Sequence, residues 1–136
     1  MATCSRPRSA PHTLDDIAVT VLASIIGHRP GRLLIDAGGL ALSKDRSTEA
    51  VPIDYGFGLM LDRYGRRSFG DAVVRRVYQE HGLVELDAAY PAELPVGALV
   101  RIAPNHTCMT AAAHDRYHVV NGSDRVEDVW YRVNHW

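Results

Sequence analysis

The stretch Ile17-Ala-Val-Thr-Val-Leu-Ala-Ser-Ile-Ile26 indicates the secondary-structure class of the chain. Its odd-numbered positions, from Ile17 to Ile25, are all apolar, so hydrophobic side chains recur at every second residue. A period of two places these side chains on one face of a β-strand, and the β-branched content agrees with that assignment. The preceding Thr13-Leu-Asp-Asp16 resembles a helix capping box, but the period of two outweighs it. The stretch therefore predicts a strand.

Short strands separated by turns are expected along most of the remaining chain. They are predicted at residues 32–36, 73–79, 83–87, 96–102, 117–120 and 125–133. In Val96–Ile102 the apolar residues alternate, and Asn121-Gly122 between two β-rich runs is a strong hairpin signal. Residues 43–72 have many Gly, Pro and Asp and no clean period, which indicates an irregular connection with short strands at most. One or two helical turns are expected at Thr110–His114.

These elements predict a mainly β fold, a small β-barrel or sandwich-like domain with one or two short helices. Helices and strands do not alternate, which excludes a doubly wound parallel sheet. Residues 1–12 have little apolar content and are expected to form a flexible leader. Residues 13–136 are expected to form one β domain, because a chain of 136 residues is long enough for one core.

Charge and composition exclude several classes of function. The net charge is −1, which argues against binding to nucleic acid or to an anionic membrane. No apolar run reaches the roughly 18 residues that a membrane span needs. Two cysteines cannot support a disulfide-rich scaffold, and the N-terminus lacks the apolar region of a secretory signal. We therefore expect a cytoplasmic protein with reduced thiols.

The most specific candidate site is Pro104-Asn105-His106-Thr107-Cys108, which follows a predicted strand. In extended backbone, residues i and i+2 point to the same side, so His106 and Cys108 would present an imidazole nitrogen and a thiolate together. This pair of donors suits zinc, and two protein ligands leave open positions for catalysis. His114-Asp115 and His118 are candidate partners of these ligands. The alternative is a buried cysteine beside a surface histidine.

Other motifs have a functional and a structural interpretation. Glu80 and His81 in Gln79-Glu-His-Gly82 provide a carboxylate and an imidazole for acid–base chemistry, or only a polar turn. Asp54-Tyr-Gly-Phe-Gly58 would allow the backbone to approach a ligand, or would form a loop with a packed aromatic ring. Asp36-Ala-Gly-Gly39 would form a tight exit from a strand at the edge of a catalytic site, or only a turn. Three further features are Cys4, expected to be inert, and Trp130-Tyr131 and Trp136, expected to pack in a core or an interface.

An ordered series of short motifs resembles the C-terminal domain of D-serine dehydratase and D-threonine aldolase-like enzymes. The series consists of Ile17–Ile26, Leu34–Asp45, Gln79–Gly82, Val96-Gly97 with Val100–Ile102, Pro104–Cys108, His114-Asp115 with Tyr117–Val120, and Val129-Trp130. The resemblance extends from about residue 14 to the end of the chain. An ordered series is far more specific than any one of its motifs.

The resemblance implies a fold-type III pyridoxal phosphate enzyme, related to alanine racemase. In that family an N-terminal α/β-barrel domain holds the cofactor on a lysine, and the C-terminal β domain brings a divalent metal. The family's Pro-Asn-His-x-Cys motif implies that His106 and Cys108 hold zinc, with a β-hydroxy D-amino acid as substrate. The aldolase branch has an Asp at the second ligand position, so Cys108 resembles the dehydratase branch. His81 would be a catalytic contact near the metal.

The length of the chain conflicts with a complete enzyme of this family. An α/β-barrel takes roughly 250 residues, and the only lysine, Lys44, follows a predicted strand exit and is a poor candidate for the cofactor lysine. The resemblance therefore implies the metal-bearing domain of a lyase, inactive without a pyridoxal phosphate-binding barrel domain, and a homodimer by analogy. Alternatives are a non-catalytic β domain that binds a metal or a protein, and a self-sufficient metal hydrolase that uses Glu80 or His81 as its base.

Overall fold

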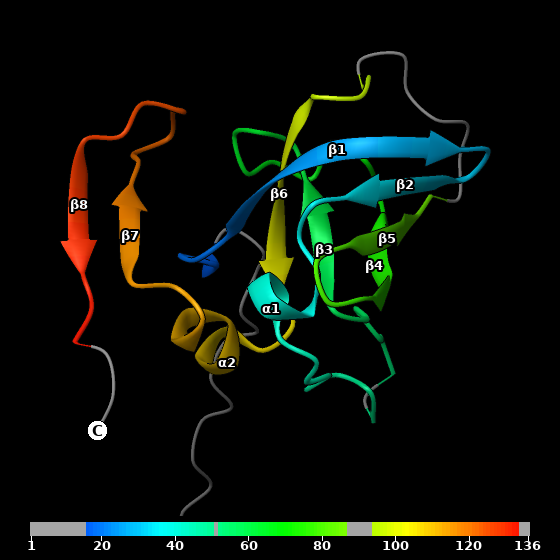
Figure 1. Cartoon of the computed structure of the whole chain (residues 1–136), viewed down its shortest axis with the longest axis horizontal. Helices are drawn as coiled ribbons and strands as arrows, with labels where there is room; N and C mark the ends of the chain where they lie inside the picture. The colour runs from blue at the N-terminus through cyan, green and yellow to red at the C-terminus, as the bar shows by residue number, and fades with distance from the viewer. Residues whose placement is uncertain (1–15, 51, 87–93, 134–136) are drawn as a thin grey trace, which may run out of the picture.

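A computed structural model describes residues 16–50, 52–86 and 94–133 of the chain. The described part contains eight strands and two short helices (Figure 1). This confirms the prediction of a mainly β fold with one or two short helices. The predicted leader, Cys4 and Trp136 lie outside the described residues.

Six strands form a closed barrel. They are β1 (Val21–Arg29), β2 (Arg32–Ile35), β3 (Gly58–Leu61), β4 (Val73–Val77), β5 (Gly82–Glu85) and β6 (Leu99–Pro104). Their spatial order is β1-β2-β5-β4-β3-β6, and every neighbouring pair is antiparallel. The barrel closes where β6 pairs with β1, with Val21 opposite Ile102. Of the two architectures expected from the sequence, the structure shows the barrel.

Alternating apolar residues fill the interior of this β-barrel. Along β1, Val21, Ala23 and Ile25 are buried, whereas Leu22 and Ile26 between and after them are exposed. Each of the six strands contributes at least one side chain that is completely inaccessible to solvent: Ile25, Ile35, Met60, Val74, Val84, Val100 and Ile102. Alternation of this kind follows from the pleat, which turns successive side chains to opposite faces of the sheet. The apolar interior therefore holds the strands in register.

The ends of β1 and β6 differ from the expected ones because of strand pairing and, for β6, because of a turn that precedes the strand. β1 begins at Val21 rather than residue 17, since its pairing with β6 starts at Val21, and Ile17 is 41% exposed. It continues to Arg29 because it pairs with β2 in this part. β6 begins at Leu99 rather than residue 96, since Gly97 adopts a φ of 91° in a turn before the strand. The hydrophobic period therefore located these strands but not their ends.

The two helices lie at one end of the β-barrel and pack against each other. Helix α1 covers Gly39–Leu42 and helix α2 covers Thr107–Ala112. The sequence predicted one or two helical turns at Thr110–His114, which begins three residues later than α2, and it predicted no helix at Gly39–Leu42. The Thr110 hydroxyl lies 2.9 Å from the carbonyl oxygen of Leu42, which connects α2 to the end of α1. This buried contact is formed between segments that are distant in the sequence.

A separate two-stranded sheet follows α2. Its strands are β7 (Arg116–Val119) and β8 (Asp128–Tyr131), and Gly122 has a φ of 67° in their connection. The hairpin predicted around Asn121-Gly122 is therefore confirmed. Figure 1 shows it beside the β-barrel, beyond α2. Trp130 and Tyr131 are 57% and 73% exposed, so a core role for them is wrong and the interface interpretation stays a prediction.

None of the helices in the described part of the chain is long and apolar enough to cross a membrane.

Candidate functional site

Two candidate motifs meet at the helical end of the β-barrel. The backbone N–H of Gly39, at the start of α1, donates to the carbonyl of Tyr78 at 2.7 Å, and that of Leu40 donates to Gln79 at 3.2 Å. At Gly38 an added Cβ would lie 2.4 Å from the backbone nitrogen of His81. The loop at 36–39 and the turn at 79–82 are therefore in direct backbone contact, which the sequence did not predict.

His81 and Glu80 lie in this turn with exposed side chains. The Glu80 carboxylate accepts a hydrogen bond from the Gln79 side-chain amide at 3.2 Å. The backbone carbonyl of His81 accepts from Tyr78 at 2.8 Å, which closes the turn. The turn interpretation is thus supported, and a catalytic role for His81 stays a prediction.

His106 and Cys108 lie where β6 passes into α2. His106 directly precedes the helix and has extended backbone, with φ −124° and ψ 94°, whereas Cys108 is the second helical residue. The expectation that both residues share one extended segment is therefore wrong. Pro104 is the last residue of β6 and lies opposite Gly58 of β3. Cys108 is exposed and its thiol is free, which excludes the alternative of a buried cysteine.

The His106 ring contacts a carboxylate that the sequence did not single out. Its Nδ1 lies 2.9 Å from Oδ2 of Asp45, three residues beyond the end of α1. The two side chains are 30% and 54% exposed. The contact joins residues far apart in the chain, and no local motif marks it.

Two of the three predicted partners of His106 and Cys108, Asp115 and His114, contact other groups. Asp115 forms two hydrogen bonds with the guanidinium of Arg116, at 2.9 and 2.7 Å. The hydrogen bond from Arg116 lowers the pKa of Asp115 and keeps it ionised. Nε2 of His114 lies 3.1 Å from the carbonyl oxygen of Ala41, to which it must donate. His118 lies in β7 with an exposed side chain. The prediction that Asp115 supports His106 is therefore wrong.

The donor atoms of His106 and Cys108 suit zinc, but these two residues do not make a complete set of zinc ligands. Imidazole nitrogen and thiolate sulfur are the donors that zinc prefers. Within the described ranges, no cluster of three or more His, Cys, Asp or Glu side chains could hold a metal ion. His106 and Cys108 would thus supply two ligands, and further ligands would have to come from water, substrate or another part of an enzyme.

Asn105 anchors the connection that follows α1 and contains Asp45. Its side-chain amide donates to Oγ1 of Thr48 at 2.7 Å and also to the carbonyl of Gly56. Its Oδ1 accepts from the backbone N–H of Thr48 at 3.2 Å. One side chain therefore attaches two points of the 43–57 connection to the end of β6.

Replacement of Asn105 by alanine should lower the free energy of unfolding by about 1–3 kcal/mol, because it leaves part-buried polar groups without partners. Urea denaturation followed by circular dichroism would measure the change. Asn121→Ala is the control, because Asn121 is exposed in the hairpin connection. Equal stability of the two variants would contradict an anchoring role.

The chain is matched by a family model described as "Putative serine dehydratase domain" over residues 18–120. This match covers all six strands of the β-barrel, both helices and β7. The chain belongs to the serine dehydratase domain family. The family resemblance expected from the sequence is thus confirmed.

Curated relatives of this serine dehydratase domain include two dehydratases. D-threo-3-hydroxyaspartate dehydratase of Delftia sp. is 37% identical over 129 residues, covering 90% of this chain and 33% of the relative. D-serine dehydratase of Schizosaccharomyces pombe is 33% identical over 127 residues, covering 89% and 28%. The chain thus spans about a third of the length of these enzymes. An uncharacterized protein of Mycobacterium tuberculosis is 32% identical over 119 residues, and the chain covers 80% of it.

Solved structures show the same fold. An alanine racemase-like protein of Idiomarina loihiensis has a TM-score of 0.80 and 40% identity, covering 90% of this chain and 33% of that one. Two variants of D-threo-3-hydroxyaspartate dehydratase, one with a histidine and one with a cysteine replaced by alanine, each have a TM-score of 0.80 and 33% identity and cover 92% of this chain. The two replaced positions are two residues apart, and the cysteine variant is described as the metal-free form.

The Asp54–Gly58 motif of this serine dehydratase domain has a structural role. The backbone N–H of Gly56 donates to Asp54 at 2.8 Å and lowers the pKa of that carboxyl, with a further contribution from Arg46. Phe57 packs against the barrel core. An added Cβ at Gly56 would lie 2.5 Å from the carbonyl oxygen of Val74. The interpretation as a loop with a packed aromatic ring is therefore supported.

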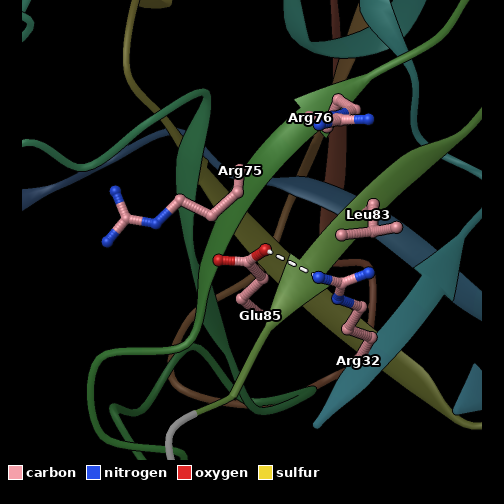
Figure 2. Close-up of a pocket in the computed structure, with 5 residues that line it drawn as sticks. All are labelled: Arg32, Arg75, Arg76, Leu83 and Glu85. Carbon is pink, nitrogen blue, oxygen red and sulfur yellow. Dashed lines mark ion pairs between the residues drawn. The ribbon is translucent and has the colours of Figure 1, made fainter.

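A small hollow of about 130 Å³ lies on the outer surface of β2, β4 and β5, away from the helical end. Figure 2 shows Arg32 and Glu85 facing each other across neighbouring strands, as an ion pair 3.8 Å apart. Arg75 points away from this pair and lies 3.6 Å from Asp54. The arginines do not converge on a common point, so the hollow is a weak candidate site.

Proposed function

We propose that this chain is the metal-bearing domain of a pyridoxal phosphate-dependent lyase that acts on β-hydroxy D-amino acids. The observation that carries the proposal is the match to two dehydratases of D-amino acids over about nine tenths of the chain. Their names specify D-serine and D-threo-3-hydroxyaspartate, which both have a hydroxyl group on Cβ. Dehydration rather than aldol cleavage is the proposed reaction, in agreement with Cys108 at the second ligand position.

His106 and Cys108 are the proposed metal ligands. Their spacing is the same as that of the histidine and cysteine replaced in the D-threo-3-hydroxyaspartate dehydratase variants, where the cysteine variant is described as metal-free. The exposed thiol of Cys108 and the partly exposed ring of His106 leave room for a metal ion and a substrate atom. Zinc, when bound, supplies Lewis acidity to the oxygen of a leaving group. His81 is the proposed second polar contact on the same end of the β-barrel.

The proposed activity needs a second domain. Pyridoxal phosphate, when bound, supplies an electron sink for the substrate carbanion, and a family barrel domain would hold it. Lys44, the only lysine, lies in the loop after α1 with an exposed side chain, so we assign the cofactor lysine to the partner. A cytoplasmic location would keep Cys108 reduced, and a homodimer is the proposed assembly.

Native mass spectrometry of the whole chain tests the metal site. The wild type should carry zinc, and Cys108→Ser should lose it, because the hydroxyl of serine is a much poorer ligand than a thiolate. Cys4→Ser is the matched control, since it removes the other cysteine of the chain. Zinc that remains bound in Cys108→Ser, or disappears in Cys4→Ser, would contradict the assignment. The same spectra report the oligomeric state.

Complementation tests the lyase role. The chain is mixed with the pyridoxal phosphate-binding domain of a dehydratase relative, and pyruvate release from D-serine is measured. Activity should require both parts, fall at least 10-fold in Cys108→Ser, and fall in His81→Ala if His81 contacts the substrate. Release of pyruvate that is the same with and without the chain would contradict the proposal.

A second candidate function is a non-catalytic β domain that binds a metal or a protein. The specific observation in its favour is the Mycobacterium tuberculosis relative, of which this chain covers 80%, so that relative also has little length for a cofactor-binding barrel. This function predicts zinc or protein binding without any gain of pyruvate release on complementation. The two measurements above therefore distinguish the candidates.

A further inference from the structure

The contact between Asp45 and His106 determines which ring nitrogen is available. Oδ2 of Asp45 lies 2.9 Å from Nδ1 of His106, a hydrogen-bond distance. An ionised carboxylate only accepts hydrogen bonds, so the shared hydrogen belongs to Nδ1. In a neutral imidazole the other nitrogen, Nε2, then carries the lone pair. The contact therefore holds the ring so that Nε2 is the nitrogen whose lone pair can bind a metal ion.

Asp45 is held in place by an unusual backbone conformation. Ser43, at the end of α1, has a φ of 71° and is only 8% exposed. Its hydroxyl oxygen accepts a hydrogen bond from the backbone N–H of Asp45 at 2.9 Å, and its own N–H donates to Gly39 at 3.0 Å. A non-glycine residue in such a region is strained and persists only where its surroundings impose the conformation. The hydrogen bonds of Ser43 therefore fix the backbone of the loop that carries Asp45.

The backbone of His106 is attached to the same scaffold. Its carbonyl oxygen accepts from the backbone N–H of Thr110 at 3.2 Å and lies 2.9 Å from the Thr110 hydroxyl. That hydroxyl is also 2.9 Å from the carbonyl of Leu42, the residue before Ser43. Thr110 is 1% exposed. The buried hydroxyl therefore connects the backbone on both sides of the Asp45–His106 contact.

We infer that Asp45 is a positioning residue, which holds His106 in the Nδ1–H tautomer and thereby presents Nε2 to a divalent metal. The inference rests on the proposed metal site. Metal-binding histidines commonly donate their other ring N–H to a carboxylate, which orients the ring and increases its basicity. The sequence assigned this role to residues after α2, whereas the structure assigns it to the loop after α1.

Two measurements on the full chain test this inference. The tautomer of His106 in the metal-free protein is read from ¹⁵N chemical shifts and long-range ¹H–¹⁵N couplings. The zinc dissociation constant is measured by competition with a chromophoric chelator. Asp45→Ala should shift the ring proton from Nδ1 toward Nε2, giving a mixture of the two tautomers, and should weaken zinc binding about 10- to 100-fold. Asp45→Asn keeps a hydrogen-bond acceptor and should retain the wild-type tautomer and much of the affinity.

Glu49→Gln is the matched control, because it removes a nearby exposed carboxylate that pairs with Arg46 rather than with His106. It should change neither the tautomer nor the affinity. If Asp45→Ala keeps the proton on Nδ1 and binds zinc like the wild type, the inference is overturned while the metal site stands. If wild type and Cys108→Ser both fail to bind zinc, the proposed metal site falls and the inference falls with it. Circular dichroism checks that each variant is folded.

Discussion

Replacement of Ile102 by alanine is expected to lower the free energy of unfolding by about 2–5 kcal/mol. Ile102 is completely buried in β6 and lies opposite Val21 of β1 and Met60 of β3. It thus occupies the position where the last strand joins the first. Strands on both sides hold the backbone in place, so the structure cannot collapse around the cavity that the substitution leaves. Urea denaturation followed by far-UV circular dichroism would measure the loss.

Leu22→Ala is the matched control, because it also truncates a large aliphatic residue of the barrel wall. Leu22 lies opposite Arg101 on the outer face and is 58% exposed. Its loss should change stability by about 0.5 kcal/mol or less. A domain of this size has a total stability of about 5–15 kcal/mol, so the two variants should be clearly separated. Similar effects at both positions would show that the interior does not dominate stability.

Local patterns predicted those parts of the fold that depend on neighbours in the sequence. Alternation of apolar residues in 17–26 and 96–102 located β1 and β6, and Asn121-Gly122 located the hairpin. The ends of these strands depend on partners elsewhere in the chain. Residues 17–20 keep the alternation, but β1 pairs with β6 only from Val21 onward. The alternation of apolar residues within one segment cannot predict where its pairing with another strand begins.

Local sequence patterns could not predict the closure of the barrel or the positions of the two helices, because both depend on residues that are distant in the sequence. The pairing of residues 21–24 with residues 99–102 decides between a barrel and a sandwich, and it links the two ends of the core. Helix α1 has only four residues and helix α2 six, too few to be stable by propensity alone. Their positions depend on tertiary contacts, such as that of Thr110 with Leu42.

The sequence selected candidate residues for the site but did not predict how they are arranged. His106 and Cys108 were selected from the sequence, but Cys108 lies in a helix rather than in extended backbone. Asp115 was favoured because it is close in sequence, yet Arg116 holds its carboxylate. Asp45 was missed because the packing of α1 on α2, and not sequence proximity, brings it to His106. Local chemistry left the role of His106 and Cys108 open, and the resemblance to the family favours the metal-ligand interpretation, which stays a prediction.

Replacement of Gly38 by alanine should lower the free energy of unfolding by about 1–3 kcal/mol. An added Cβ would lie 2.4 Å from the nitrogen of His81 and 2.5 Å from the carbonyl oxygen of Gln79. Both are backbone atoms, which cannot turn aside as a flexible side chain can. The substitution should therefore push α1 away from the 78–82 turn, and the loop with Asp45 should move with it. Urea denaturation measures the stability, and the tautomer of His106 reports on the loop.

Gly27→Ala provides the matched control for this prediction. Gly27 also lies outside the positive-φ region, and its added Cβ would meet only the Cβ of Leu34, at an ordinary 3.8 Å. Both substitutions restrict the unfolded chain equally, an effect that stabilises the folded state by about 0.4–1 kcal/mol where the native conformation accepts alanine. Gly27→Ala should therefore be neutral or stabilising, and the difference between the variants isolates the contact at His81. If Gly38→Ala is as stable as Gly27→Ala, α1 does not pack closely on the 78–82 turn. The argument that this packing positions Asp45 beside His106 would then be contradicted.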